Sequence, residues 1–165
     1  MRYRVLGTII GLAVATSAIS AGGREATPTA KLLAPIHQFM ASFNKGDAIG
    51  AAATHAADVT IIDEVPPHLW RGPKAFETWA ADLAANDKAK GITDEVVTLG
   101  KTQRAMIDGD AGYAVLKALY TYKLNGVATA EAATMTFALK SGKDGWKITA
   151  WSWDGTVPHP AAAGK

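Results

Sequence analysis

Val59-Thr-Ile-Ile-Asp63 lies between an Ala-rich helical segment and the turn sequence Trp70-Arg-Gly72. A short apolar run of this composition predicts a β-strand. Strand alternation then puts Val59, Ile61 and Asp63 on the same face. If that face is the core, a carboxylate lies at the edge of an apolar interior. Desolvation there disfavours the ionised form of a carboxyl group, so such an acid can serve as a general base or acid.

Helical patterns stand on both sides of this strand. Residues 31–44 carry apolar side chains at spacings of three and four, which predicts a helix. Gly46 is the expected left-handed residue after that helix, and Asp47 is expected to cap a second, short helix over residues 48–55. Pro73 is at the first position of a third predicted helix, which extends to about Lys88.

From Gly91 onward the pattern changes to β. Strands are predicted over residues 93–107, with a bend at Gly100, and over residues 112–123, 127–140 and 146–154. Asn125-Gly126 is the signal for a two-residue hairpin of type I′. Helices followed mainly by antiparallel strands indicate an α+β fold. We therefore expect three N-terminal helices packed on a strongly curved mixed, mainly antiparallel sheet that encloses a pocket.

Residues 1–21 have the layout of a secretory signal peptide, with a basic start, an apolar segment and a small-residue cleavage region that ends at Ala21. The rival interpretation is a membrane anchor, but the apolar run is shorter than the roughly 20 residues of a spanning helix. We expect a cleaved protein that is secreted or periplasmic and no longer attached to a membrane. Residues 22–30 are expected to be a flexible lead-in, residues 31–155 one domain, and residues 156–165 a loose tail.

The composition disfavours several classes of function. The chain has no cysteine and a formal net charge of +2, without a cluster of Lys and Arg, which argues against disulfides and nucleic-acid binding. The histidines, at positions 37, 55, 68 and 159, form no helical i, i+4 pair, so no metal site is predicted. No segment has the pattern of a phosphate-binding loop or a nucleophile elbow. We expect neither a metal nor another cofactor.

Four segments in this order resemble the nuclear transport factor 2-like superfamily, which includes SnoaL-like cyclases and ketosteroid isomerases. They are Phe39-Met-Ala-Ser-Phe-Asn-Lys-Gly-Asp47, Ala57-Asp-Val-Thr-Ile-Ile-Asp63, Trp70-Arg-Gly-Pro-Lys-Ala-Phe76 and Gly145-Trp-Lys-Ile148. The resemblance covers nearly all of residues 31–155 and implies a cone-shaped α+β fold with a pocket. It does not identify the function, because this fold hosts both enzymes and non-catalytic binders.

By this resemblance, Asp63 takes the position of the general base of ketosteroid isomerases. The two donors with which such an isomerase stabilises an enolate fall on Phe39 and near Met135, and neither side chain can donate a hydrogen bond. The first hypothesis is therefore an exported protein that binds a small, largely apolar ligand, with Asp63 as its polar anchor. The second is a SnoaL-like isomerase or cyclase, in which Asp63 removes a proton next to a carbonyl group.

A third hypothesis is a non-catalytic dimeric assembly module. Trp151 and Trp153 share one face of the last predicted strand, and two large aromatic side chains are costly to leave in water. We expect them to form a homodimer interface on the outer face of the sheet. The competing role is an aromatic clamp for a ligand.

Candidate site residues follow from these hypotheses. The candidate catalytic residues are Asp63, His55 and His68, where a histidine or a tyrosine would steady the enolate. Glu64 is expected on the opposite strand face, in solvent. The candidate ligand-binding residues are the apolar and aromatic side chains expected around the pocket, namely Phe39, Phe43, Ile61, Trp70, Trp79, Tyr113, Met135 and Phe137.

Overall fold

The computed structural model describes residues 26–161. The predicted signal peptide and its cleavage position lie outside this range. The helices within it are α1 (Pro28–Phe43), α2 (Ala48–Ala52) and α3 (Ala75–Lys90). The strands are β1 (His55–Ile62), β2 (Leu69–Arg71), β3 (Ile92–Asp108), β4 (Ala111–Leu124), β5 (Val127–Gly142), β6 (Gly145–Gly155) and β7 (His159–Pro160). The predicted α+β class is confirmed.

Local chemistry fixes the ends of these elements. The side chains of Thr27 and Asp47 accept hydrogen bonds from backbone N–H groups in the first turns of α1 and α2. Gly46 and Gly91 have positive φ angles of 68° and 70°, which let the chain turn sharply after α1 and α3. Asn125-Gly126 joins β4 to β5 with φ angles of 50° and 86°, as a type I′ turn requires.

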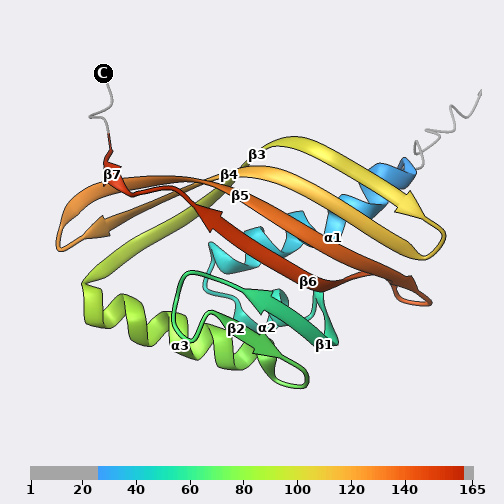
Figure 1. The fold of residues 1–165 in the computed structure, drawn as a ribbon, viewed down its shortest axis with the longest axis horizontal. Coiled ribbons are helices and arrows are strands. Elements are labelled where there is room, and N and C mark those ends of the chain that lie inside the picture. The colour runs from blue at the N-terminus through green and yellow to red at the C-terminus, as the bar shows by residue number, and fades with distance from the viewer. Residues whose placement is uncertain (1–25, 162–165) are drawn as a thin grey trace, which may run out of the picture.

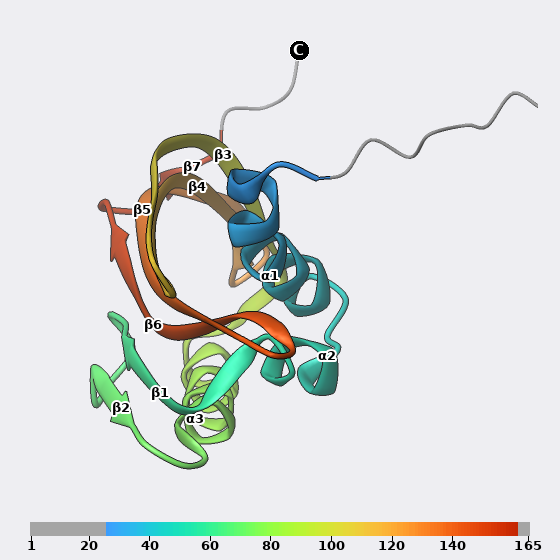
Figure 2. The same ribbon diagram turned by 90° about the vertical axis from the view of Figure 1, so that its right-hand side faces the viewer.

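The strands form one sheet in the order β2-β1-β6-β5-β4-β3, with β7 paired to β5. The neighbours β1 and β6 are parallel and the other pairs are antiparallel, so the predicted mixed sheet is confirmed. Figure 1 shows the strands stacked in this order, with α3 beside β1 and β2. Seen end-on in Figure 2, the sheet curves from β1 to β3, and α1 lies across the open side of the curve. The sheet does not close into a barrel, because its edge strands β2 and β3 do not pair.

Several boundaries differ from the sequence prediction. The helix α1 begins at Pro28, inside the expected flexible lead-in, so Pro35 lies in the middle of the helix. His55 begins β1 instead of ending α2. Leu69–Arg71 pairs with β1 within a predicted loop, and His159–Pro160 of the predicted loose tail pairs with β5. These short strands are held by longer neighbours, so their own sequences carry little signal.

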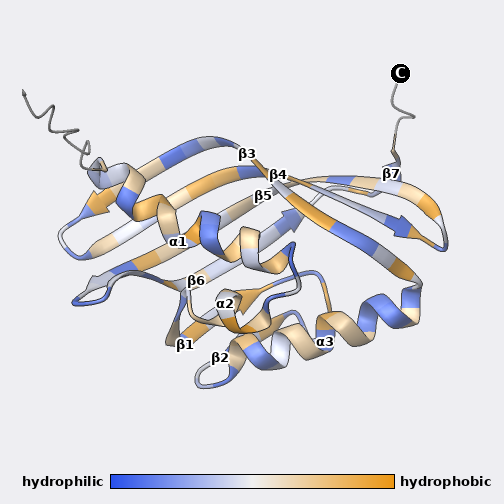
Figure 3. Cartoon of the chain, turned by 180° about the vertical axis from the view of Figure 1, so that it is seen from behind, coloured by the Kyte–Doolittle hydropathy of each residue, from blue (hydrophilic) through white to orange (hydrophobic). Residues whose placement is uncertain are grey.

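The core lies between the helices and the concave face of the sheet. Its fully buried side chains include Ile36, Ile61, Leu116, Phe137 and Ile148. In Figure 3 the C-terminal end of α3 is hydrophilic, in contrast to the hydrophobic stretches of the central strands. Over residues 26–161, no helix has the length and apolar character needed to cross a membrane.

Candidate functional site

A cavity of about 390 Å³ lies between α1, α3 and the concave face of the sheet. Its wall takes residues from α1, α3, β3, β4, β5 and β6, and from the segment that follows β1. Most of these side chains are apolar or aromatic. The ionisable groups in the wall are Asp63, Glu64, Asp87, Lys90, Tyr120, Tyr122 and Glu131. A cavity of this size, apolar with a few polar groups, is typical of a site for a small molecule.

Trp79 of α3 is the centre of one aromatic wall. Its ring centroid lies 4.9 Å from that of Trp151 in an edge-to-face arrangement, and 6.2 and 6.3 Å from those of Phe39 and Phe43. Aromatic pairs in such geometries stabilise a fold by about 0.5–1.5 kcal/mol beyond the burial of their area. Trp79 is buried, and its ring contacts fix its place in this wall.

Asp63 follows directly after β1, and both of its carboxylate oxygens accept hydrogen bonds. Oδ1 accepts from the backbone N–H of Val65 at 3.0 Å, and Oδ2 accepts from the indole Nε1–H of Trp79 at 3.1 Å. The first bond turns the chain out of the strand. The second bond ties the carboxylate to α3. Asp63 is therefore held at a defined place in the cavity wall.

Glu131 of β5 is a buried acid beside Asp63. Its side chain is 2% exposed, and its Oε1 accepts a hydrogen bond of 2.9 Å from the indole N–H of Trp153. Glu64 is exposed on one side and shares a hydrogen bond with Glu131 on the other. Desolvation, followed by the charges of Glu131 and Asp63, raises the pKa of Glu64 to about 7. Desolvation also raises the pKa of Glu131.

A second pair of acids lies at the α3 side of the cavity. Asp87 is 6% exposed, and desolvation together with the nearby charge of Glu95 raises its pKa to about 6. Asn86 donates a hydrogen bond to Asp87, and the hydroxyl of Tyr120 donates to Glu95 at 2.6 Å. Desolvation and this bond to Glu95 raise the pKa of Tyr120 far above its ordinary value, so Tyr120 stays a neutral donor.

The structure places the predicted ligand-binding residues in two groups. Phe39, Phe43, Trp79 and Met135 line the cavity, together with the predicted acid Asp63. The remaining four do not line it. Ile61 and Phe137 are buried in the core, Trp70 donates its indole N–H to Asp82 at 2.8 Å, and Tyr113 is 41% exposed on β4.

The two candidate histidines do not join Asp63 in the cavity wall. The ring of His55 packs between those of Phe39 and Phe76, at 4.7 and 4.6 Å. Desolvation lowers the pKa of His55 to about 4, so the ring is neutral at neutral pH. His68 is exposed in the loop before β2, and its Nδ1 lies 3.2 Å from the backbone oxygen of Asp63. The structure therefore brings neither ring to the cavity.

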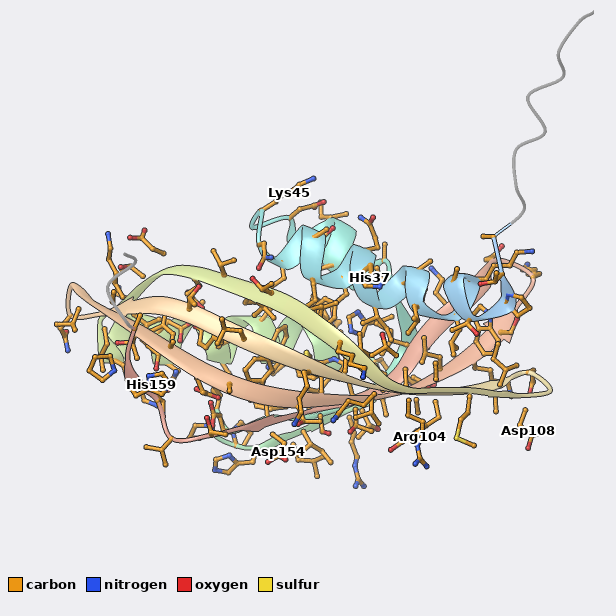
Figure 4. All side chains as sticks on the ribbon, turned by 90° about the horizontal axis from the view of Figure 1, so that it is seen from above. His37, Lys45, Arg104, Asp108, Asp154 and His159 are labelled. Atoms are coloured by element: carbon orange, nitrogen blue, oxygen red, sulfur yellow. The ribbon has the colours of Figure 1, made fainter. Side chains whose placement is uncertain are left out.

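The prediction that Trp151 and Trp153 lie on the outer face of the sheet is wrong. Both line the cavity, and Trp151 is 3% exposed. Figure 4 shows Asp154, the next residue along β6, on the side of the sheet away from α1. Alternation accordingly directs Trp153 toward the helices. The competing role, a pair of aromatic side chains beside a ligand, matches this position. The homodimer itself stays a prediction, but Trp151 and Trp153 do not form its interface.

Sequence reasoning also missed acids that the structure brings to the cavity. Glu64 was expected on the opposite face, but β1 ends at Ile62, so strand alternation no longer applies to it. Glu131 lies on the inward face of β5, in alternation with Ala133 and Met135, and an acid in such a series is a readable signal. Asp87 is eight residues beyond Trp79 and therefore lies on the same face of α3.

A metal ion is not favoured by this arrangement. Within residues 26–161, no group of three or more His, Cys, Asp or Glu side chains has a geometry that could hold one. The acids are instead paired through protons and tied to indole N–H groups. Chemically, the site can hold a small molecule against aromatic rings and exchange protons with it near neutral pH.

Comparison with known proteins identifies the fold and a family. The model of a family described as the SnoaL-like domain matches residues 32–153. No curated protein matches the chain. Among solved structures, a putative ketosteroid isomerase from Shewanella frigidimarina is 22% identical, with a TM-score of 0.60 over 75% of this chain and 94% of that one. A ketosteroid isomerase-like protein from Erwinia carotovora atroseptica is 17% identical, with a TM-score of 0.60 over 77% and 95%. The hub of CaMKII from S. rosetta is 17% identical, with a TM-score of 0.66 over 81% and 100%. At these identities the structural similarity establishes the nuclear transport factor 2-like fold, as predicted.

Proposed function

Since the chain belongs to the family of SnoaL-like domains, we propose that it binds a small, largely apolar molecule in its cavity, with Asp63 as a polar anchor. The observation that carries this proposal is the cavity of about 390 Å³ with its wall of packed aromatic rings. Phe39, Trp79 and Trp151 supply flat apolar surface, and burial of apolar ligand area there is worth roughly 25 cal/mol per Å². The hydrogen bond from Trp79 fixes the carboxylate of Asp63, so an entering molecule meets an ordered polar group.

Two matched probes test this proposal. Indane and 1-indanone have nearly the same shape, and only 1-indanone carries a carbonyl oxygen. We expect both to shift the indole ¹H–¹⁵N resonances of Trp79, Trp151 and Trp153, because these rings form the cavity wall. The indole resonance of Trp70 is the internal control, because its N–H is bonded to Asp82 outside the cavity. If millimolar concentrations of both probes leave the three wall resonances unchanged, the binding proposal fails.

A second candidate function is proton transfer next to a carbonyl group. The observation that favours it is the indole N–H of Trp151, which is buried in the cavity wall and has no acceptor within residues 26–161. Asp63 would take a proton from the carbon beside the carbonyl. The electron pair would move to the carbonyl oxygen, and Trp151 would donate a hydrogen bond to the resulting enolate. Return of the proton from Asp63 would complete an isomerisation or an exchange.

Hydrogen–deuterium exchange at the α-carbon of 1-indanone tests this second candidate. We expect the protein to accelerate exchange in D₂O, and Asp63→Asn to reduce the acceleration by about 10²–10⁴-fold, the usual contribution of a positioned base. Asp154→Asn removes the same charge from the outer face and should leave the rate unchanged. Equal exchange rates for Asp63→Asn and the wild type would end this candidate and leave the binding function intact.

A further inference from the structure

Acidic groups dominate the ionisable side chains of the cavity wall. Asp63, Glu64, Asp87 and Glu131 carry carboxyl groups, whereas Lys90 supplies the ammonium group among the described wall residues. Asp63, Glu64 and Glu131 are close enough for their charges to act on one another. An apolar cavity with this excess of negative charge repels anions and stabilises a cation.

Aromatic rings surround the same acids. The ring centroids of Tyr120 and Tyr122 are 4.6 Å apart, and those of Tyr120 and Trp153 are 6.0 Å apart. Trp153 also donates its indole N–H to Glu131, so one ring joins the aromatic and acidic parts of the wall. Faces of tryptophan and tyrosine attract ammonium groups, and this attraction grows when the cation is desolvated. Carboxylates and aromatic rings side by side are the chemistry that recognises an organic cation.

Trp151 gives an independent sign that the cavity is built for an occupant. It is 3% exposed, lines the cavity, and its Nε1–H has no acceptor within residues 26–161. A buried donor without an acceptor costs about 1–3 kcal/mol. A bound molecule would reduce that cost by presenting an acceptor atom or, more weakly, the face of an aromatic ring to this N–H.

We infer that the cavity selects a small organic cation, in which an ammonium group lies against Glu64 and Glu131 among the rings of Tyr122 and Trp153, and an apolar group fills the space beside Trp79. This inference rests on the proposed binding function and names the chemical class of its ligand. A neutral molecule of the same shape leaves the acid pair to be neutralised by a proton. A cation replaces that proton with a charge–charge contact and with attraction to the aromatic faces.

Three probes that share one ring test the inference, namely benzylammonium, benzyl alcohol and benzoate. Binding is measured at pH 8 by titration calorimetry and by the indole resonances of Trp151 and Trp153. We expect benzylammonium to bind at least about tenfold more tightly than benzyl alcohol, and benzoate not to bind. Benzylammonium should also bind more tightly as the pH rises through about 7, where Glu64 loses its proton. The affinity for benzyl alcohol should not rise over the same pH range. The ionisable groups that face Glu64 are Glu131, Asp63, Lys90 and Tyr122.

Glu131→Gln is the decisive variant, because the amide oxygen can still accept the indole N–H of Trp153 while the charge is lost. We expect this variant to lower the affinity for benzylammonium about tenfold and to change the affinity for benzyl alcohol less than about twofold. Asp154→Asn removes one negative charge from the outer face and should change neither affinity.

The outcomes separate the two proposals. Equal or tighter binding of benzyl alcohol, or an unchanged benzylammonium affinity in Glu131→Gln, would overturn the cation inference and leave apolar binding in place. If neither benzyl probe binds and indane and 1-indanone also fail, the proposed function falls together with the inference.

Discussion

Replacement of Phe39 by alanine should lower the free energy of unfolding by about 3–5 kcal/mol, the range observed when a buried phenylalanine is truncated. Phe39 is 1% exposed and contacts the rings of His55, Phe76, Trp79 and Trp151. Its removal would merge a new void with the existing cavity and loosen α1 from α3 and β6. A loss of this size is a large share of the roughly 5–15 kcal/mol that holds a domain folded. Urea unfolding at pH 7 measures it.

His55 provides a second readout of the same change. Burial against Phe39 lowers the pKa of His55 to about 4, so solvent that enters the void should move the pKa back toward 6.5. The ring proton resonances of His55 report this shift. Phe39→Leu fills most of the volume and is the matched control, with an expected loss below about 1.5 kcal/mol. A loss of that small size in Phe39→Ala would show that the site collapses around the missing ring.

Asp87→Asn should raise the free energy of unfolding at pH 8 and change it little near pH 4. Desolvation and the charge of Glu95 raise the pKa of Asp87 from 3.8 to about 6. Between these values the folded state holds a proton that the unfolded state has released, so the free energy of unfolding falls as the pH rises through this window. The full shift corresponds to about 3 kcal/mol, and solvent screening at the cavity reduces the expected gain to about 2 kcal/mol.

Asparagine suits this test because it keeps the local hydrogen bonds. Its amide oxygen can accept from Asn86, and its amide N–H can donate to Glu95. Urea unfolding of the two proteins at matched pH values measures the difference between their free energies of unfolding. The pH-dependent contribution of His55 is the same in both proteins and cancels in this difference. Asp154→Asn, on the outer face, serves as the control for a change in net charge. If Asp87→Asn and the wild type have the same free energy of unfolding at pH 8, burial imposes no cost on the ionised form of Asp87, and the prediction is wrong.

The elements with strong local signals were predictable from the sequence. Asn125-Gly126 needs positive φ at both residues, which few other pairs allow, and it fixed the hairpin between β4 and β5. The apolar alternation of β1 placed Val59 and Ile61 in the core, and Asp63, the first residue after the strand, lies at the cavity as expected. Asp47 and Gly46 marked the passage from α1 to α2. In each case a few neighbouring residues decide the conformation.

The errors arose where distant parts of the chain decide the outcome. Simple alternation along residues 146–154 places Ile148 on the face opposite Trp151. In the structure both are buried on the concave side, because the register of β6 against β5 shifts between the pairs Ala150–Ala138 and Ile148–Leu139. One extra residue at such a bulge reverses which side chains face inward. The acid pair joins Glu64, in the segment after β1, to Glu131 within β5, and these two residues are far apart in the sequence.

The strand β6 is the last long strand in the chain, yet it lies in the interior of the sheet between β1 and β5. During synthesis on the ribosome, β1 can pair with β2 and pack on α3, but its edge toward β6 stays unpaired until residues 145–155 have emerged. Assembly of the native topology therefore waits for almost the whole polypeptide. A chain that terminates prematurely before Gly145 would leave the facing edges of β1 and β5 unpaired, which makes such products ready substrates for chaperones and proteases.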